Sequence, residues 1–479
     1  MLFNSFAFLI FFTVFYTVFY YSRGTIRQLV LFLASCIFYA WFIPKYLLIL
    51  FLAIAIDYYA AIKIEEADSD KKKKIALILG VVNTSLILFV FKYHNFFIDN
   101  INFISGLKLS HWSLILPIGL SFHTFQSLSY VIDVYWGKVK AERNILIYAN
   151  YVMMFPQLVA GPIERAGHLI PQIRNSFYSK LSDSDFVIGS SLFFYGLFKK
   201  VVVADNIGPY VSAVFDNYTH HNGATMFVGT MFFAIQIYAD FSGYSDMAIG
   251  VARTLGFKFN DNFQTPYFSR SVTEFWRRWH ISLSSWLRDY LYYPLVLSTG
   301  KITKTKMNLS ILATFAIIGL WHGAAWTFVI FGTLHGIYLV VESLTDKYRK
   351  NLVSFIHLDK LPFLHHILDS LLTFILVSLS FVFFRAKSLD QSFYMLKKIF
   401  SDYKISDVSL LDTNSFAIIL FSIAILFSTE YLVFRKYSID DIYNKAKGNI
   451  FLYSIAVISI LFVFSFGSWG ETSFIYFQF

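Results

Sequence analysis

Long blocks of apolar residues alternate along this chain with short polar segments that hold most of its charges. The blocks are single runs close to the roughly 17–25 residues that a helix needs to cross a membrane. They lack the strict alternation of apolar and polar residues that is typical of strands in a membrane barrel. The hydrophobic pattern therefore predicts an all-α protein that crosses the membrane many times.

The first apolar block, residues 1–21, has no basic residues before it and no small-residue cleavage site. We interpret it as a retained span and not as a cleaved signal peptide. The blocks that follow it and have the length of a span predict about twelve crossings in all. They are residues 28–42, 45–62, 75–91, 113–131, 186–197, 226–238, 309–320, 324–341, 367–384, 415–432 and 450–466.

The basic residues orient these spans. The four consecutive lysines of the segment 63–74 place it in the cytoplasm, because short cytoplasmic loops carry an excess of Lys and Arg. Counting outwards from it, we expect segments 92–112 and 205–223 and the tail 467–479 on the outer side. Three basic residues fall on the wrong side in this scheme: Lys199, Lys200 and Arg385.

Two apolar pieces break the alternation. The first, residues 145–162, runs into FPQLVAGPIER, where Pro156 and Pro162 interrupt helical hydrogen bonding. Broken backbone at membrane depth is tolerated only where it is buried in protein or lines a cavity. We therefore predict a re-entrant hairpin at 145–162 and a second re-entrant or interfacial helix at 272–293.

Composition supports a membrane protein and excludes other classes. Only 15% of the residues are charged, against about 25% in soluble proteins, and the mean hydropathy is +0.57. The single cysteine, Cys36, excludes an internal disulfide framework. The net charge of +10 lies mostly in loops between spans and does not indicate nucleic-acid binding. We predict one integral-membrane domain, residues 1–479, with a catalytic core at 117–336 and a last span and tail at 450–479.

The stretch from Tyr238 to Pro294 gathers an unusual number of polar side chains among aromatic ones. Polar groups at membrane depth are costly and tend to be functional. If Trp276–Tyr293 is one helix, its apolar face contains Trp279, Leu283, Trp286, Leu287 and Tyr290. Its polar stripe contains Arg277, His280, Ser284 and Arg288.

This amphipathic helix has two interpretations. In the functional one, its arginines hold an anionic donor near the cytoplasmic side, because the planar guanidinium bonds phosphate bidentately, and His280 faces a cavity. In the structural one, the arginines contact lipid phosphates and His280 bonds a carbonyl. Asp289 is expected to pair with Arg288 or to cap the helix.

His322 lies in GLWHGAAW, between apolar half-helices. Desolvation favours the neutral imidazole, which is the form that a general base needs. Acyl transfer from a thioester to a hydroxyl needs such a base and little else from ionisable groups. The alternative is a histidine that hydrogen-bonds across helices as structural glue. His335 is expected to point away from His322 and to be structural or supporting.

Carboxylates directly after the predicted span 226–238, among them Asp240 and Asp246, could pair with Arg277 or Arg278. A structural ion pair at the end of a span is the simpler interpretation, and Glu164 with Arg165 has the same one. No metal-ligand spacing, glycine-rich phosphate loop or GxSxG motif is present. We therefore expect no metal.

Several of these stretches together resemble the membrane-bound O-acyltransferase family. FWRRWHISLSSWLRDYLYYPL followed by GLWHG carries the resemblance to the family as a whole. FSGYSDMAIGVARTLGF, PIGLSFHTFQSLSYVIDVYWG and FPQLVAGPIER resemble its bacterial polysaccharide branch. That branch includes the membrane proteins of alginate and peptidoglycan O-acetylation and, more distantly, that of teichoic-acid D-alanylation. The resemblance is strong over residues 117–336 and weaker elsewhere.

The resemblance implies a fold, a reaction and a place in the cell. The fold would be a ring of helices, with re-entrant pieces, around a central funnel in the bacterial cytoplasmic membrane. His322 would be catalytic and His280 would support it. The donor would be acetyl-CoA from the cytoplasm, bound by Arg277, Arg278, Arg288, Ser284 and Trp279. The acetyl group would pass to a separate, extracytoplasmic esterase-like transferase of the SGNH type, which acetylates an exported polysaccharide.

The chain ends in SFIYFQF, which resembles the aromatic tail of a small companion peptide of the teichoic-acid system. The resemblance suggests that Tyr476 relays the acetyl group, whereas an interfacial aromatic anchor is the alternative. A different class of function, a transporter or flippase of a lipid-linked glycan, would also use broken helices. Transporters usually contain paired repeats, and we find none in this sequence.

Overall fold

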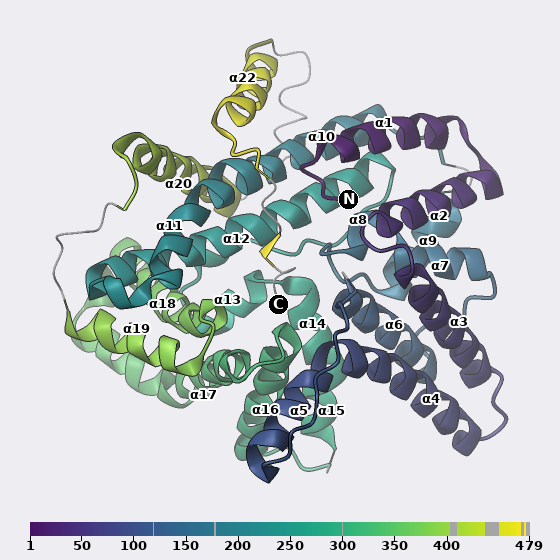
Figure 1. Cartoon of the computed structure of the whole chain (residues 1–479), viewed down its shortest axis with the longest axis horizontal. Helices are drawn as coiled ribbons and strands as arrows, with labels where there is room; N and C mark the ends of the chain where they lie inside the picture. Colours follow the sequence, from purple (N-terminus) through teal and green to yellow (C-terminus); the bar gives the residue numbers. More distant parts are fainter. Residues whose placement is uncertain are drawn as a thin grey trace. The chain divides into compact units, whose positions relative to one another are not determined.

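A computed structural model describes residues 1–117, 119–176, 179–298, 300–402, 410–435, 450–470 and 474–475. These ranges are built from helices and connecting loops and contain no β-strand (Figure 1). The described chain forms two compact units. The first contains Met1–Phe194 and Tyr244–Asp261, and the second contains Tyr195–Gly243 and Asn262–Phe479.

The first unit consists of the N-terminal helices. They are α1 (Phe6–Tyr21), α2 (Gly24–Ala40), α3 (Tyr46–Glu65), α4 (Asp70–Leu88), η1 (Phe89–Tyr93), α5 (His94–Ser105), α6 (Leu120–Tyr135), α7 (Ile145–Met153), α8 (Phe155–Leu158), α9 (Ala166–Asn175) and most of α10 (Asp183–Leu197). Helices α3, α4 and α6 pack on one another, and α2 packs on α7. The piece predicted as a hairpin is indeed broken, because α7 ends at Met153 and α8 starts at Phe155, just before Pro156.

The second unit carries the two histidine-bearing stretches. Its helices are η2 (Phe198–Ala204), α11 (Asp205–Asp216), η3 (Tyr218–His220), the first part of α12 (Gly223–Thr254), η4 (Pro266–Phe268), α13 (Val272–Arg278), α14 (Ile281–Leu287), η5 (Arg288–Tyr292), α15 (Tyr293–Leu297), α16 (Lys304–His322), α17 (Trp326–Phe355), η6 (Leu358–Lys360), α18 (Pro362–Arg385), α19 (Leu389–Ser401), α20 (Thr413–Phe434) and α22 (Ile450–Phe466). Helix α17 packs on α16, α13 and α18.

Glycines bring α16 and α17 into very close contact. A Cβ atom on Gly319 would lie 2.1 Å from the Phe328 carbonyl oxygen, and one on Gly332 would lie 2.1 Å from the Phe315 carbonyl oxygen. Backbones can approach so closely only where one of the two residues has no side chain, which is the small-residue packing common between membrane helices. This crossing fixes the end of α16, where His322 lies.

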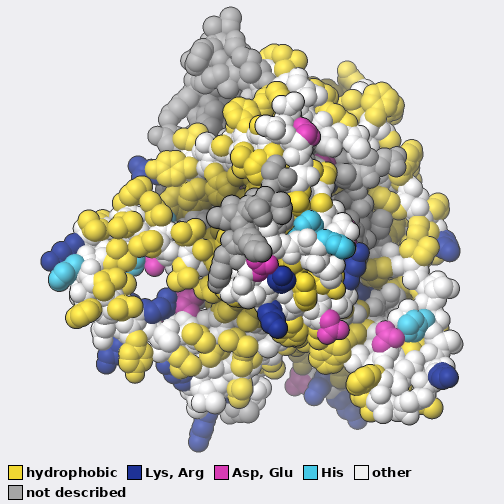
Figure 2. Space-filling view, turned by 60° about the vertical axis from the view of Figure 1, so that its left-hand side comes forward, with side chains coloured by type: hydrophobic (Ala, Val, Ile, Leu, Met, Phe, Trp, Pro, Cys, Tyr) yellow, Lys and Arg dark blue, Asp and Glu magenta, His cyan; other side chains and the backbone are white. Residues whose placement is uncertain are grey.

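The described residues contain seven helices that are long and apolar enough to cross a membrane, and the count of about twelve crossings stays a prediction. They are Tyr46–Glu65, Asp70–Ser105, Asp183–Asp216, Gly223–Thr254, Trp326–Phe355, Pro362–Arg385 and Thr413–Phe434, and the shorter apolar helices are Phe6–Tyr21 and Gly24–Ala40. Hydrophobic side chains cover much of the face in Figure 2, and Phe6, Leu48 and Phe363 are each more than 70% exposed. Such surfaces suit lipid, so the chain is a multi-pass membrane protein. The predicted ring around a funnel and the single 1–479 domain stay predictions.

Two segments that were expected on the outer side are largely helical, so the loop predicted at 205–223 is wrong, whereas the side on which either segment lies stays a prediction. Most of segment 92–112 is helical, because the chain from Asp70 stays helical to Ser105. Most of segment 205–223 is helical too, since α10, η2 and α11 form one run to Asp216. The hydropathy pattern stopped these spans at charged residues, whereas the helices continue past them.

Candidate functional site

The prediction that Trp276–Tyr293 is a single helix is wrong, because the helix is interrupted at Trp279 and His280. Helix α13 ends at Arg278, Trp279 is extended, and α14 starts at Ile281. The α13 start is capped by Ser271, whose hydroxyl accepts from the Glu274 N–H at 3.1 Å. Because the helix is interrupted, residues before and after the break no longer follow one helical period. The predicted polar stripe of Arg277, His280, Ser284 and Arg288 on one helix face therefore does not exist.

His280 occupies the left-handed backbone region, with φ 43° and ψ 55°. That conformation costs a non-glycine residue roughly 1–3 kcal/mol and persists only where the surroundings impose it. Here the conformation is imposed by the backbone of the segment Asn262–Gln264, which hydrogen-bonds to the residues around His280. The Ile281 N–H donates to the Asn262 carbonyl at 2.9 Å, and the Gln264 N–H donates to the Arg278 carbonyl at 2.9 Å.

Asn262 also fixes the tautomer of His280. The Asn262 Oδ1 atom accepts from the Ser282 hydroxyl at 2.8 Å and from the Ser282 backbone N–H, which orients the amide. His280 Nδ1 lies 3.0 Å from the same oxygen, so Nδ1 carries the proton and donates it. His280 is fully buried among aromatic rings, where the neutral ring is favoured, and its Nε2 atom is therefore the basic nitrogen.

His322 ends α16 and is almost fully buried. Its ring meets those of Phe331 and Phe384, with centroids 6.0 and 5.4 Å away. The following Gly323 leaves the helix in an extended conformation, and a Cβ atom there would lie 2.2 Å from the Phe328 ring. The WHG sequence thus closes the helix and packs its last side chain against aromatic groups.

Trp321 connects the two histidines within the second unit. Its ring centroid lies 5.0 Å from that of His322 and 6.2 Å from that of His280. The imidazoles therefore cannot be further apart than the sum of these two distances. The geometry brings together the two histidines that the sequence had singled out, although 42 residues separate them in the chain.

His335 differs from both in that its ring nitrogens have complementary partners. The Trp276 indole N–H donates to Nδ1 at 3.2 Å, so Nε2 carries the proton toward the Ser380 hydroxyl at 2.7 Å. Ser380 in turn donates to the Val377 carbonyl. This closed network agrees with the structural role predicted for His335.

The five residues predicted to bind the donor are spread over different environments. Arg277 and Arg288 are exposed, and Arg288 pairs with Asp289 at 3.0 Å, as predicted. Arg278 is half-buried and pairs with Glu274 at 2.7 Å. The Ser284 hydroxyl donates to the Trp279 carbonyl, and the Trp279 side chain is buried against Phe275 and Phe381.

The carboxylate of Asp240 lies within α12, and the prediction that it follows a span is wrong. It forms an ion pair with Lys200 at 2.7 Å, and Lys200 also pairs with Asp205 at 2.8 Å. All three side chains are buried. The expected pairing of Asp240 with Arg277 or Arg278 is replaced by this internal triad.

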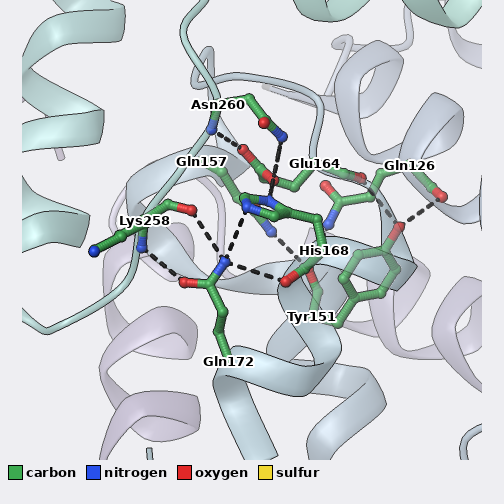
Figure 3. Close-up of polar contacts among 8 residues, drawn as sticks. All are labelled: Gln126, Tyr151, Gln157, Glu164, His168, Gln172, Lys258 and Asn260. Carbon is green, nitrogen blue, oxygen red and sulfur yellow. Dashed lines mark hydrogen bonds and ion pairs between the residues drawn. The ribbon is translucent and has the colours of Figure 1, made fainter.

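Glu164 belongs to a polar cluster in the first unit (Figure 3). Its fully buried carboxylate accepts from the backbone and side-chain N–H groups of Asn260 at 2.7 and 2.9 Å. It also bonds the Nδ1 atom of His168 at 2.7 Å. Gln172 completes the cluster through a pair of hydrogen bonds with the backbone of Lys258. The cluster fastens the loop after α12 to α9.

His168 gives this cluster a pH dependence. The hydrogen bond to Glu164 raises the pKa of His168 above its ordinary value of about 6.5. Protonated His168 therefore adds stability that is present below pH 6.5 and is lost as the pH rises through the raised pKa. We expect the wild-type melting temperature to fall more between about pH 6 and pH 9 than that of His168→Gln. Parallel curves for the two proteins would contradict this.

Tyr476 lies outside the described residues. Within the described ranges, no group of three or more His, Cys, Asp or Glu side chains could hold a metal ion. Three features of the site were not predicted: the Asn262 clamp on His280, the shared Trp321 ring and the Lys200 triad. Asn262 is 18 residues from His280, and no local periodicity relates the two.

Residues 142–355 match the model of the membrane-bound O-acyltransferase family. The chain is 37% identical to the probable alginate O-acetylase AlgI of Azotobacter vinelandii over 94% of this chain and 88% of the relative. It is 35% identical to the peptidoglycan O-acetyltransferase of Helicobacter pylori, over 83% of this chain and 79% of the relative. It is 26% identical to the teichoic acid D-alanyltransferase of Bacillus subtilis, over 50% of this chain and 62% of the relative.

Proposed function

This chain belongs to the membrane-bound O-acyltransferase family and is an acyltransferase, and on that premise we propose that it moves acetyl groups from cytoplasmic acetyl-CoA toward an exported polysaccharide. The observation that carries the proposal is the pairing of His280 and His322 through Trp321 in a buried site. The relatives named for alginate and peptidoglycan O-acetylation support an acetyl group and a polysaccharide acceptor.

His322 is the proposed general base. It would take the proton from an acceptor hydroxyl while that oxygen attacks the thioester carbonyl carbon. As the carbon–sulfur bond breaks, the same proton would pass to the leaving thiolate, which releases neutral CoA thiol and an acetyl ester. Its burial among aromatic rings is compatible with this role, because the neutral imidazole is the form that can accept a proton.

His280 is the proposed supporting residue. Asn262 holds its Nδ1–H, which leaves Nε2 as an acceptor for a proton of the acceptor hydroxyl or for a polar group of the donor. The imposed backbone conformation supports a positioning role, since strained residues cluster at functional sites. Both histidines would then act near the same reacting centre, since each lies against the Trp321 ring.

The acetyl-CoA donor is proposed to use the arginines around the break. Arg277 and Arg288 are exposed and can meet phosphate groups, although Arg288 also pairs with Asp289, whereas Arg278 is half-buried and paired with Glu274. Arg277 and Arg288 are therefore proposed as the main phosphate contacts, with Arg278 adding charge. Ser284 and Trp279 hold the two halves of the broken helix together and would shape the donor site rather than carry charge.

The acceptor side is proposed to involve a second protein. An extracytoplasmic SGNH-type transferase would receive the acetyl group and place it on the polymer outside the bacterial cytoplasmic membrane. Tyr476 is proposed as the relay between the two. The comparison with the H. pylori and A. vinelandii enzymes supports a cell-envelope or extracellular glycan as final acceptor, without distinguishing between the two polymers.

The proposal is tested by following free CoA thiol. The purified full chain in lipid nanodiscs is given acetyl-CoA, with and without a purified SGNH-type transferase and short glycan acceptors. We expect release of CoA that rises when partner and acceptor are present, with the acetyl group recovered on the glycan by mass spectrometry. Absence of CoA release in every combination would refute acetyl transfer and would favour transport of a lipid-linked glycan.

A further inference from the structure

The last described residues of the chain are seated inside the second unit. Phe474 and Ile475 are 1% and 8% exposed. The Ile475 backbone N–H donates to Asp240 Oδ2 at 2.7 Å, a short hydrogen bond to a carboxylate. A C-terminal segment is normally poorly ordered unless something ties it down, and here a buried charge does so.

The Asp240 carboxylate is built to accept this bond. Its other oxygen, Oδ1, pairs with Lys200, which also pairs with Asp205, so two carboxylates share one ammonium group. Such a buried triad has an excess of negative charge, and a further N–H donor helps to stabilise it. The tail amide is that donor.

A different helical run, η2 with α11, holds the chain at the end of α22. The Ser468 N–H donates to the Val201 carbonyl at 2.9 Å, and the Asn206 side-chain amide donates to the Phe466 carbonyl at 3.0 Å. Val201 lies in η2, a π-helical turn, and such turns are frequent at functional sites. The tail is thus held on both sides of residues 471–473.

The seated tail reaches the histidine site through one aromatic ring. Phe474 lies against Phe241, with ring centroids 5.8 Å apart. Phe241 in turn forms a T-shaped contact with the His280 ring, with centroids 4.7 Å apart, and Phe263 contacts both Phe241 and His280. Phe474 therefore backs the aromatic wall that encloses His280.

We propose that the segment Phe474–Ile475 is an integral wall of the His280 site and that Asp240 is the positioning residue that seats it. With the tail N–H on Asp240, Phe474 keeps Phe241 packed on the imidazole, which keeps the ring in place and shields it from water. The proposal rests on the proposed function only for the statement that His280 belongs to an acyl-transfer site. It needs no assumption about Tyr476.

The test uses Ile475→Pro, which removes the one N–H that Asp240 accepts and leaves the buried triad untouched. Ile475→Val, which keeps that N–H, is the matched control. Full-length protein in nanodiscs is treated with diethylpyrocarbonate, which modifies neutral imidazole, and each histidine is quantified by peptide mass spectrometry. We expect labelling of His280 to rise about tenfold or more in Ile475→Pro and to stay at the wild-type level in Ile475→Val.

His335 provides an internal control, because it is equally buried in the same unit and its ring nitrogens bond Trp276 and Ser380. Labelling of His280 alone would support the proposal. Unchanged labelling of His280, or an equal rise at His335, would overturn it, since the tail would then be either irrelevant to the site or a general structural element. A wild-type protein that never releases CoA would refute the proposed function but would leave the labelling comparison decisive.

A second pair of variants tests the same hydrogen bond by changing its acceptor, Asp240, instead of its donor. Asp240→Asn leaves one acceptor oxygen for two partners, so Lys200 or Ile475 loses its contact. Glu430→Gln is the matched control, because Glu430 is a buried carboxylate paired at 2.9 Å with Lys199, the residue beside Lys200. We expect increased labelling of His280 only in Asp240→Asn, together with a lower kcat and an unchanged KM for acetyl-CoA. The proposal would be overturned if labelling of His280 stayed at the wild-type level in Asp240→Asn or rose equally in Glu430→Gln.

Discussion

Replacing His322 by glutamine is expected to reduce acetyl transfer by about 10³-fold while the protein still folds and inserts. Glutamine has nearly the volume of histidine and can hydrogen-bond, but it has no basic nitrogen. The loss should appear in kcat, with the KM for acetyl-CoA little changed, because the base acts only as the acceptor proton leaves. CoA release by purified protein with saturating acetyl-CoA and acceptor measures it.

The matched control is His335→Gln on the neighbouring helix. His335 is at least as buried as His322, but its nitrogens belong to the closed network with Trp276 and Ser380. Disturbing that network should lower the melting temperature and leave the kcat of the folded fraction within about threefold of wild type. If His322→Gln kept wild-type kcat, or if the two variants lost activity equally, the base would have to be sought elsewhere.

The sequence was sufficient to identify the class of fold and it also singled out two histidines, whose catalytic roles stay predictions; physical reasons explain why both stood out. Apolar blocks of spanning length leave few options other than membrane helices, because an unpaired backbone is too costly in lipid. A lone polar residue between such blocks, as in GLWHG, is conspicuous for the same reason. His322 and His280 are therefore conspicuous in the sequence itself.

The helix ends were harder to predict because buried charges can neutralise one another. The predicted span 186–197 ended before Lys200, and the next predicted loop began at Asp205, since charged residues usually mark the edge of the membrane. In the structure the two side chains pair at 2.8 Å inside one continuous helical run. The partner that makes the charge tolerable, Asp240, is 40 residues away and cannot be found from local hydropathy.

The break at His280 was missed for a related reason. The apolar period continues through Trp279, Leu283 and Trp286, so a local pattern predicts one helix. The helix stops because the backbone at Asn262–Gln264 pairs with the residues around His280 and imposes a left-handed conformation there. A tertiary contact thus overrides a favourable local pattern, and it does so at the residue that the site needs to orient.

The second large effect is expected at the crossing of α16 and α17. Gly319→Ala would place a methyl group 2.1 Å from the Phe328 carbonyl oxygen and 3.1 Å from the Val329 Cα atom. Both are backbone atoms that no side-chain rotation can move, so the two helices must separate. Alanine gains about 1 kcal/mol over glycine in a helix, but forced separation of a packed contact costs about 1–3 kcal/mol or more.

We therefore expect Gly319→Ala to lower the melting temperature and also to reduce activity, because His322 follows Gly319 by less than one helical turn. Gly208→Ala in α11 is the control: its new methyl group would meet only the end of the flexible Gln236 side chain, at 3.2 Å, so alanine should be neutral or stabilising there. Thermal unfolding in nanodiscs and CoA release would be measured on both.

A Gly319→Ala protein as stable and active as Gly208→Ala would mean that the crossing is looser than the backbone distances require, and the position of His322 would then need another explanation. A less stable but fully active protein would separate the two effects and would show that the imidazole is held by its aromatic neighbours rather than by the helix crossing.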